Sequence, residues 1–278
     1  MSWWEKILKI DPRVIYFIML VGVTVPLISP IGLPMTIVDT TVQAYEEVEK
    51  LQPGDRVLVS FDCSPGGAAE LEPVAYALLA HFLEKDIKVY GTTSVPEAIA
   101  LSRRGLEFYE KAGKAYGKDY VNLGYFAGGE NAVAALSENF RSVFKADING
   151  TPLDQIEMMQ EVKDMNDIDM VVSINSGPGG NATSDVWVRQ VAVVYPDVPM
   201  ILAVTAVMAP GDMPYLQSGQ IKGLLGGLRP GAEYEMLLEK PGTAVAMMDA
   251  QSAAHITILV FILLGNIAYF ATKLNKAS

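Results

Sequence analysis

The sequence predicts an α/β fold: an open, mostly parallel, doubly wound sheet with internally repeated βαβ units, flanked by N- and C-terminal transmembrane helices. Three observations carry this prediction. Short runs of Val, Ile and Leu alternate with helical patterns, as in a parallel sheet that helices cover on both faces. Three of these runs end in a Gly-Gly turn that opens a helical pattern. Long apolar stretches lie near both ends of a chain that is 50% hydrophobic, which indicates membrane segments.

The first apolar segment runs from Val14 to about Ser29, and no charge follows it before Asp39. A helix of this length rises about 24 Å, which is short for a hydrocarbon core of roughly 30 Å. The proline-bearing continuation is needed to complete a span, so we expect a transmembrane helix over 14–34. A cleavable signal peptide is the alternative, but no A-x-A-like cleavage site follows the apolar run.

Three units in the central region share one pattern: an apolar run, a turn that ends in two glycines, and a helical stretch. They begin with VLVSFDCSPGG at 57–67, DYVNLGYFAGG at 119–129 and MVVSINSGPGG at 170–180. The first and third align without a gap and share the whole of Pro-Gly-Gly. This self-similarity predicts an internal duplication of a βαβ unit.

The same periodicities set the expected elements of the domain. We expect strands near 57–61, 87–91, 119–123, 169–174 and 200–205. We expect helices near 42–51, 68–85, 96–115, 129–144, 154–163, 182–194 and 212–221. A Rossmann-like strand order and the spiral fold of crotonase and Clp-type hydrolases are both compatible with this series.

The turns after the strands are the candidate ligand or oxyanion site. Carboxyl ends of parallel strands share one edge of a sheet, where helix amino termini present free N–H groups. Paired glycines let the backbone turn and offer those amides to an anion or a carbonyl oxygen. The candidate residues are Asp62, Ser64, Gly66, Gly67, Gly128, Gly129, Asn175, Ser176, Gly179 and Gly180. Binding of a small anion or a nucleotide is therefore one candidate function, although no G-x-G-x-x-G or Walker loop is complete.

The DCSPGG and NSGPGG turns resemble the oxyanion-hole turn of signal-peptide-peptidase-type and Clp-type serine hydrolases. The resemblance covers about ten residues in each copy and implies that the glycine amides stabilise an oxyanion. The candidate nucleophile is then Ser94, which follows the next strand. A nucleophilic serine needs a base, yet His81 lies in a helical pattern, His255 lies in the second apolar segment, and no lysine is marked by position. We therefore expect a membrane-bound hydrolase only as an alternative.

The segment at 204–240 is rich in glycine and leucine. Glycines between apolar side chains favour close approach of another backbone. We expect a contact between subunits, or a collar next to the membrane, with an irregular segment closing the sheet edge as the alternative. The residues expected at that contact are Gly223, Leu225, Gly226, Gly227 and Arg229.

The second apolar segment runs from His255 to Thr272 and ends at Lys273. Its length and basic flank predict a transmembrane helix over 254–272. Asn266 lies inside it, and we expect this amide to be satisfied between the two membrane helices.

Two spans put both ends of the sequence on one side of the membrane. The segments 1–13 and 273–278 carry five lysines and arginines, whereas the ends of the central region 35–253 offer Lys50 and Lys240. The positive-inside rule then predicts cytoplasmic tails and an extracytoplasmic α/β domain at the cell (inner) membrane.

Composition excludes further classes of protein. Cys63 is the only cysteine, so no intramolecular disulfide can form. The net charge of −11 argues against nucleic acid as a partner, because a basic face is needed to neutralise phosphates. Metal-ligand spacings are missing, and we expect neither a metal nor a cofactor.

A longer series of motifs carries a second resemblance: PIGLP, VSFD, GKDYVNLGYFAGGE, RSVF, GTPLDQIEMM, VTAVMAP, YLQSGQ and GLLGGLRPGAEYE. In this order, between two apolar segments, they resemble an uncharacterised family of two-pass bacterial membrane proteins with a central α/β domain. The resemblance implies the architecture and the membrane location but no activity. We therefore expect an oligomeric scaffold or binding module rather than an enzyme, with the lipid bilayer, further copies of the chain or another membrane protein as partners.

Overall fold

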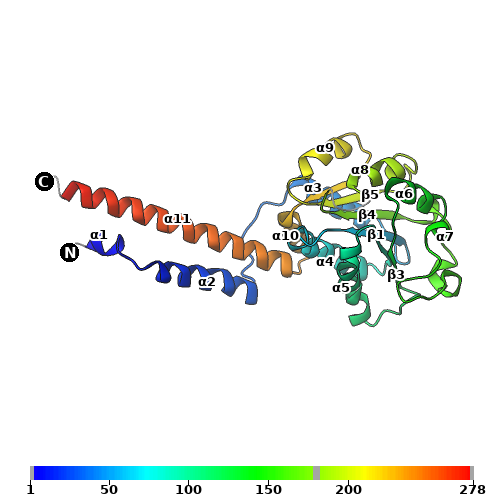
Figure 1. Ribbon diagram of the computed structural model, residues 1–278, viewed down its shortest axis with the longest axis horizontal. Coiled ribbons are helices and arrows are strands. Elements are labelled where there is room, and N and C mark those ends of the chain that lie inside the picture. The colour runs from blue at the N-terminus through cyan, green and yellow to red at the C-terminus, as the bar shows by residue number, and fades with distance from the viewer. Residues whose placement is uncertain (1–2, 178–181, 276–278) are drawn as a thin grey trace. The chain divides into compact units, whose positions relative to one another are not determined.

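The computed structural model describes residues 3–177 and 182–275. The predicted site residues Gly179 and Gly180 lie outside the described residues. The chain forms two compact units, one over Thr36–Lys240 and one made of Met1–Met35 with Pro241–Ser278. The first unit is an α/β domain and the second is helical (Figure 1).

The α/β domain is built on one parallel sheet in the order β3-β2-β1-β4-β5-β6. The strands are β1 (Arg56–Asp62), β2 (Lys88–Thr93), β3 (Tyr120–Tyr125), β4 (Met170–Asn175), β5 (Met200–Val204) and β6 (Gly223–Gly226). This is the Rossmann-like order of the two arrangements that the sequence left open. The five strands expected from the sequence are confirmed, and β6 is an addition to them.

Helices cover both faces of the sheet, which explains the continuous apolar runs in the strands. On β1, Leu58 packs into one hydrophobic cluster while Val57, Val59 and Phe61 pack into the other. The helices are α3 (Asp39–Glu49), α4 (Ala68–Glu84), α5 (Ile99–Lys111), α6 (Gly129–Glu138), α7 (Phe140–Val143), α8 (Ser184–Trp187), α9 (Ala209–Gln217) and α10 (Leu228–Leu237). Buried side chains place α3, α4, α5 and α10 on the face of Val57, and α6 to α8 on the face of Leu58.

The prediction of a helix at 154–163 is wrong. This stretch forms two 3₁₀ turns, Leu153–Gln155 and Glu157–Met159. The reason is that side chains from elsewhere bind the carbonyl groups that a helix would use. Tyr90 donates its hydroxyl to the carbonyl of Met158 at 2.9 Å, and the Arg141 guanidinium donates to the carbonyl of Met159 at 2.7 Å.

The helix expected at 182–194 is likewise shorter and less regular than an α-helix. It consists of α8 followed by a π-helical segment, Val188–Ala192. The stretch still buries the apolar side chains that its periodicity indicated, including the fully buried Trp187.

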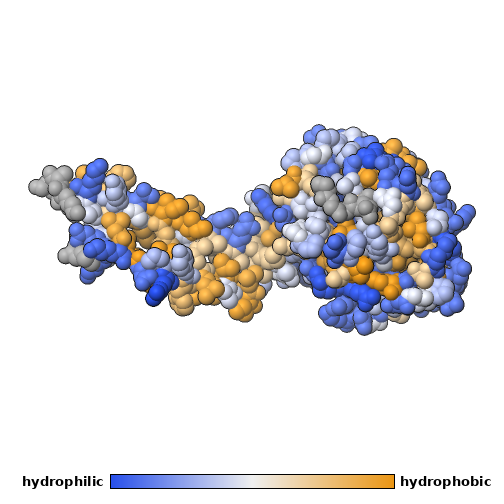
Figure 2. Space-filling model, in the orientation of Figure 1, coloured by the Kyte–Doolittle hydropathy of each residue, from blue (hydrophilic) through white to orange (hydrophobic). Residues whose placement is uncertain are grey.

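The second unit contains α1 (Trp3–Ile7), α2 (Pro12–Ile28) and α11 (Thr243–Asn275). One of the described helices, α11, is long and apolar enough to cross a membrane, and α2 is apolar but shorter. Both helices expose large apolar side chains, and Figure 2 shows their largely apolar surface. They pack on each other, with Gly22 of α2 next to Thr257 of α11. Helix α11 includes the expected span 254–272 and begins before it, at Thr243.

A buried carboxylate connects the two long helices of this unit. Asp249 of α11 is fully buried and accepts hydrogen bonds from three successive backbone amides, those of Ile31 at 2.7 Å, Gly32 at 2.8 Å and Leu33 at 3.0 Å. Gly32 has a φ of +70°, which lets successive amides converge on one anion. The PIGLP motif after α2 is therefore an anion-binding turn that Asp249 fills.

Candidate ligand site at the carboxyl edge of the sheet

The strand order puts two of the repeated glycine turns side by side. β1 and β4 are neighbours, and their last residues, Asp62 and Asn175, are in register. The helices that follow them, α4 and α8, pack on opposite faces of the sheet. In an open α/β sheet, this reversal marks the crevice where ligands bind.

The two turns are joined by a pair of serines. The Ser64 amide donates to Ser176 Oγ at 2.7 Å, and the Ser176 hydroxyl donates to Ser64 Oγ at 3.0 Å. A Cβ on Gly67 would lie 2.4 Å from the Cβ of Ser176, so this approach requires glycine. Gly66 is exposed beside them, and α4 begins directly after Gly67. Backbone amides and two hydroxyls therefore meet at one point of the edge.

Asp62 fixes the geometry beneath this point. Its Oδ1 accepts from the amide and the hydroxyl of Ser94, at 2.6 and 2.7 Å. Its Oδ2 accepts from the hydroxyl of Ser60 at 2.5 Å and from the indole N–H of Trp187 at 2.8 Å. Burial raises the pKa of Asp62, while these four donors oppose the rise. The carboxyl group connects β1, the turn after β2 and α8.

Ser94 is fully buried and occupied by structural hydrogen bonds. Its hydroxyl donates to Asp62 and accepts from the amide of Ala182 at 3.1 Å. Within the described part of the chain, it has no hydrogen bond to a lysine or histidine. The prediction of Ser94 as a nucleophile therefore finds no support in its contacts.

The two histidines do not provide a base at this edge. His81 of α4 is buried between α3 and α10, with Nε2 donating to Glu49 Oε1 at 2.7 Å. Because that nitrogen carries the proton, Nδ1 accepts from the hydroxyl of Tyr234 at 2.8 Å. Burial lowers the pKa of His81, so the ring is neutral at neutral pH. His255 lies in α11.

Cys63 is also unsuited to nucleophilic chemistry. Its side chain is 2% exposed, and burial raises the pKa of the thiol to about 11, against the effect of a hydrogen bond with Ser176. The reactive form of cysteine is the thiolate, which this site disfavours.

Asn175 shapes the second turn from within. Its amide nitrogen donates to the carbonyl of Ala182 at 2.8 Å, and its amide oxygen accepts from the backbone of Gly177 at 3.0 Å. Gly177 has a φ of +97° and packs against Met208. Asn175 binds Ala182 just before α8, and Asp62 binds Trp187 within α8, so these predicted ligand residues form the interior of the site.

Two buried polar atoms lie unpaired at the end of β5. Thr205 Oγ1 and Asp212 Oδ2 have no hydrogen-bond partner among the residues that the structure describes. Asp212 Oδ1 accepts from the hydroxyl of Ser184, and burial raises the pKa of this carboxyl group. Sequence reasoning missed these groups and Trp187, because nothing in their local pattern shows that the chain brings them to this edge.

The third glycine turn lies apart from the first two. Gly128 and Gly129 follow β3, which β2 separates from β1 in the sheet. Their φ values of +122° and +54° serve the sharp turn into α6. Glu130, next to them, pairs with Arg189 of the π-helical segment at 3.2 Å. The structure therefore does not bring Gly128 and Gly129 to the meeting point of β1 and β4.

The glycines of the segment at 204–240 approach other elements of the same chain. A Cβ on Gly223 would lie 2.7 Å from the Cβ of Ala44 in α3, and one on Gly226 would lie 2.5 Å from the Cβ of Ala209 in α9. Gly227 meets Ala206 in the same way. The close backbone approach was expected between subunits; in the structure it closes the edge of the sheet within one chain.

The two remaining residues of the expected subunit contact are engaged within the chain. Leu225 is fully buried. Arg229 donates to Glu233 Oε1 and to the carbonyl of Thr36, both at 2.7 Å.

No protein-family model and no curated protein sequence matches the chain. Among solved structures, a crystal structure of AibC is similar with a TM-score of 0.30 and 14% identity, over 82% of this chain and 48% of that one. Trehalose-6-phosphate synthase OtsA is similar with a TM-score of 0.31 and 12% identity, over 88% of this chain and 48% of that one. The chain spans about half the length of either protein. Similarity at this level carries no functional argument, and the resemblance to a two-pass membrane family is not confirmed.

Proposed function

We propose that this chain is a membrane-anchored binding module, and that its α/β domain holds a small polar ligand at the carboxyl ends of β1 and β4. The observation that carries the proposal is the hydrogen-bonded pair of Ser64 and Ser176, which joins two glycine turns at the point where the sheet reverses. Such a point offers donors and acceptors on a rigid base.

Binding is favoured over hydrolysis by the state of the candidate nucleophiles. Ser94 is buried against a carboxyl group, and the Cys63 thiol is protonated at neutral pH. The carboxylate of Glu70 is also instructive, because its Oε2 accepts from the amide of Ala206 at 2.9 Å. One backbone amide at this edge is therefore already bound to a carboxylate, whose negative charge would repel a phosphate. This favours a neutral polar ligand. Binding of a small anion or nucleotide remains the alternative.

The anchor we propose is a two-pass hairpin of α2 and α11. The two helices pack together, and Asp249 binds the turn that follows α2. A helix the length of α2 rises about 25 Å, so α2 needs a thin region of the bilayer or some residues of the PIGLP turn to span it. The charge difference between tails and central region favours cytoplasmic tails and an extracytoplasmic domain.

Assembly with further copies, or with another membrane protein, is a separate prediction. The glycine-rich segment favours assembly by its sequence pattern, but its glycines pack inside the domain. The mass of the protein in mild detergent tests it: a monomer with no cross-linked partner would refute the assembly.

The ligand site is tested by thermal unfolding of the detergent-purified full-length protein against a panel of small polar compounds. We expect at least one compound to raise the melting temperature. Gly66→Leu should abolish that rise, because the new side chain would cover the site. It should not unfold the protein, because Gly66 is exposed and its Cβ would meet only Ser64 Oγ, at 4.0 Å. Ala112→Leu, at an exposed position after α5, is the matched control. The proposal fails if no compound stabilises the protein, or if Gly66→Leu responds as the control does.

A further inference from the structure

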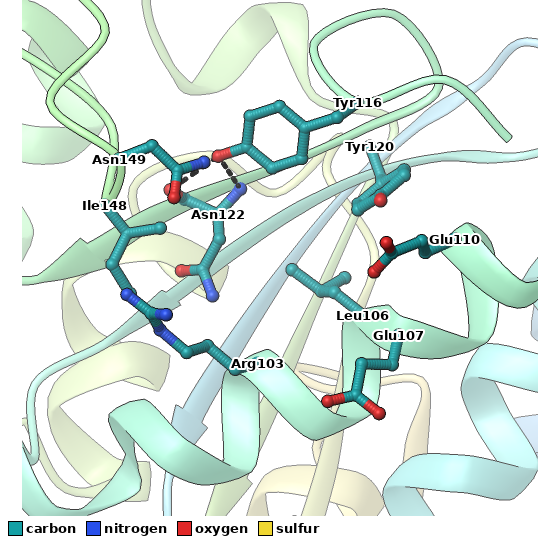
Figure 3. A pocket seen from close by; sticks show the side chains of 9 residues that line it. All are labelled: Arg103, Leu106, Glu107, Glu110, Tyr116, Tyr120, Asn122, Ile148 and Asn149. Atoms are coloured by element: carbon teal, nitrogen blue, oxygen red, sulfur yellow. Dashed lines mark hydrogen bonds between the residues drawn. The ribbon is translucent and has the colours of Figure 1, made fainter.

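A cavity lies at the opposite side of the sheet from β6, between α5 and the edge strand β3 (Figure 3). Its volume is about 360 Å³, which suits a small molecule. Three kinds of group line it: charged side chains of α5, tyrosine rings, and residues of the loop before 150. The lining includes Arg103, Leu106, Glu110, Tyr116, Tyr120 and Asn149.

The walls of this cavity are held in place. The Tyr116 hydroxyl donates to Asp147 Oδ2 at 2.7 Å, and its ring meets that of Tyr120 edge to face, with centroids 5.2 Å apart. The amide of Ile148 donates to the carbonyl of Asn122 on the open edge of β3 at 2.9 Å. The chain thereby covers its own strand edge, so that the cavity is a side-chain site and not a place for an added strand.

Opposite charges stand at the two ends of the cavity. Arg103 and Glu110 lie two helical turns apart on α5, a rise of about 10 Å. Figure 3 shows the Arg103 guanidinium toward Ile148 and the Glu110 carboxylate beside Tyr120. Neither side chain has a hydrogen bond or ion pair within residues 3–177 and 182–275. Burial and the neighbouring Glu110 both raise the pKa of Tyr120, in agreement with this placement.

Leu106 and the tyrosine rings lie between these charges, and the Glu107 carboxylate, which also lines the cavity, is paired with Lys111 at 3.2 Å. Leu106 is 3% exposed and Tyr120 is 6% exposed, so their surfaces form the floor and one wall. Aromatic faces attract cations, and a carboxylate next to them adds to that attraction. A guanidinium binds a carboxylate with paired hydrogen bonds.

We propose that this cavity binds an elongated zwitterion of the ω-amino acid class. The ligand carboxylate pairs with Arg103, its methylene chain lies over Leu106, and its ammonium group meets Glu110 and the tyrosine rings. An α-amino acid is too short to reach both charges, and a ligand with a single charge leaves one end unpaired.

The test is calorimetric titration of the detergent-purified full-length protein with 6-aminohexanoate, with hexanoate and hexylamine as single-charge controls. We expect each control to bind at least about tenfold more weakly, a difference of about 1.4 kcal/mol, because each lacks the hydrogen bonds that one charged end of 6-aminohexanoate makes. Equal binding of all three compounds would overturn the proposal. So would the absence of 6-aminohexanoate binding at about 10 mM, a concentration above the Kd expected of a weak, open site.

Matched variants locate the binding. Arg103→Gln and Glu110→Gln should each weaken the binding of 6-aminohexanoate at least about tenfold. Both variants should keep the melting temperature, because the two side chains are exposed and unpaired among the described residues. Arg104→Gln is the control, because this neighbouring guanidinium binds Glu72 at 2.7 Å instead. The same loss in all three variants would show that binding does not depend on the two charges that line the cavity and would refute the site.

Discussion

At the residue scale, Asp62 shows how one buried carboxyl group organises a sheet edge. Each of its oxygens accepts from two donors, and each pair of donors includes one N–H group that cannot reverse its role. The sequence placed Asp62 at this edge, because a polar residue that ends a buried strand faces the turn. It did not show that Ser94 and Trp187 satisfy the carboxyl group, since those partners come from distant segments.

Asp62→Asn should lower the free energy of unfolding by on the order of 1–3 kcal/mol. In either orientation, the new amide nitrogen faces a fixed donor, the backbone of Ser94 or the indole of Trp187. Urea unfolding of the full-length protein in detergent measures this loss. Asp197→Asn, at an exposed position, should change the value by less than about 0.5 kcal/mol. Equal stability of the two variants would mean that Asp62 is not held as described.

At the element scale, the sequence predicted the strands that are rich in β-branched residues and missed β6. That strand reads GLLG, and glycine is unfavourable in an isolated strand. It forms because the glycines admit α3 and α9 at short range while Leu224 and Leu225 fill the two cores. The helix predicted at 154–163 does not form, and the cause is again long-range. Tyr90 and other distant side chains bind the carbonyl groups that a helix would use.

Gly223→Ala should therefore destabilise the domain by about 1–3 kcal/mol through overpacking. The added methyl group would lie 2.7 Å from the Cβ and 2.8 Å from the Cα of Ala44, and backbone atoms cannot give way as a flexible side chain can. Gly211→Ala is the control, because no atom lies within 4 Å of its Cβ and its φ is ordinary. Thermal unfolding in detergent compares the two. A control-like melting temperature for Gly223→Ala would contradict the close packing of β6 on α3.

At the scale of the whole molecule, the sequence indicated one shared edge for three glycine turns, and the fold divides them. Parallel strands do end on the same edge, but only the strand order shows that β1 and β4 are neighbours while β3 lies beyond β2. The first and third units, which share Pro-Gly-Gly, are the ones that meet. Strand order depends on long-range packing, so local pattern could not supply it.

The proposed two-pass topology can be tested by cysteine labelling in spheroplasts. Cys63 is 2% exposed and should stay unlabelled in the unmodified protein, which makes that protein the background control. Lys118→Cys lies at an exposed position of the α/β domain, and Lys273→Cys lies near the end of α11. With cytoplasmic tails, a membrane-impermeant maleimide should label Lys118→Cys in intact spheroplasts and Lys273→Cys only after permeabilisation. The reverse pattern would invert the orientation, and labelling of both in intact spheroplasts would show that α11 does not span the membrane.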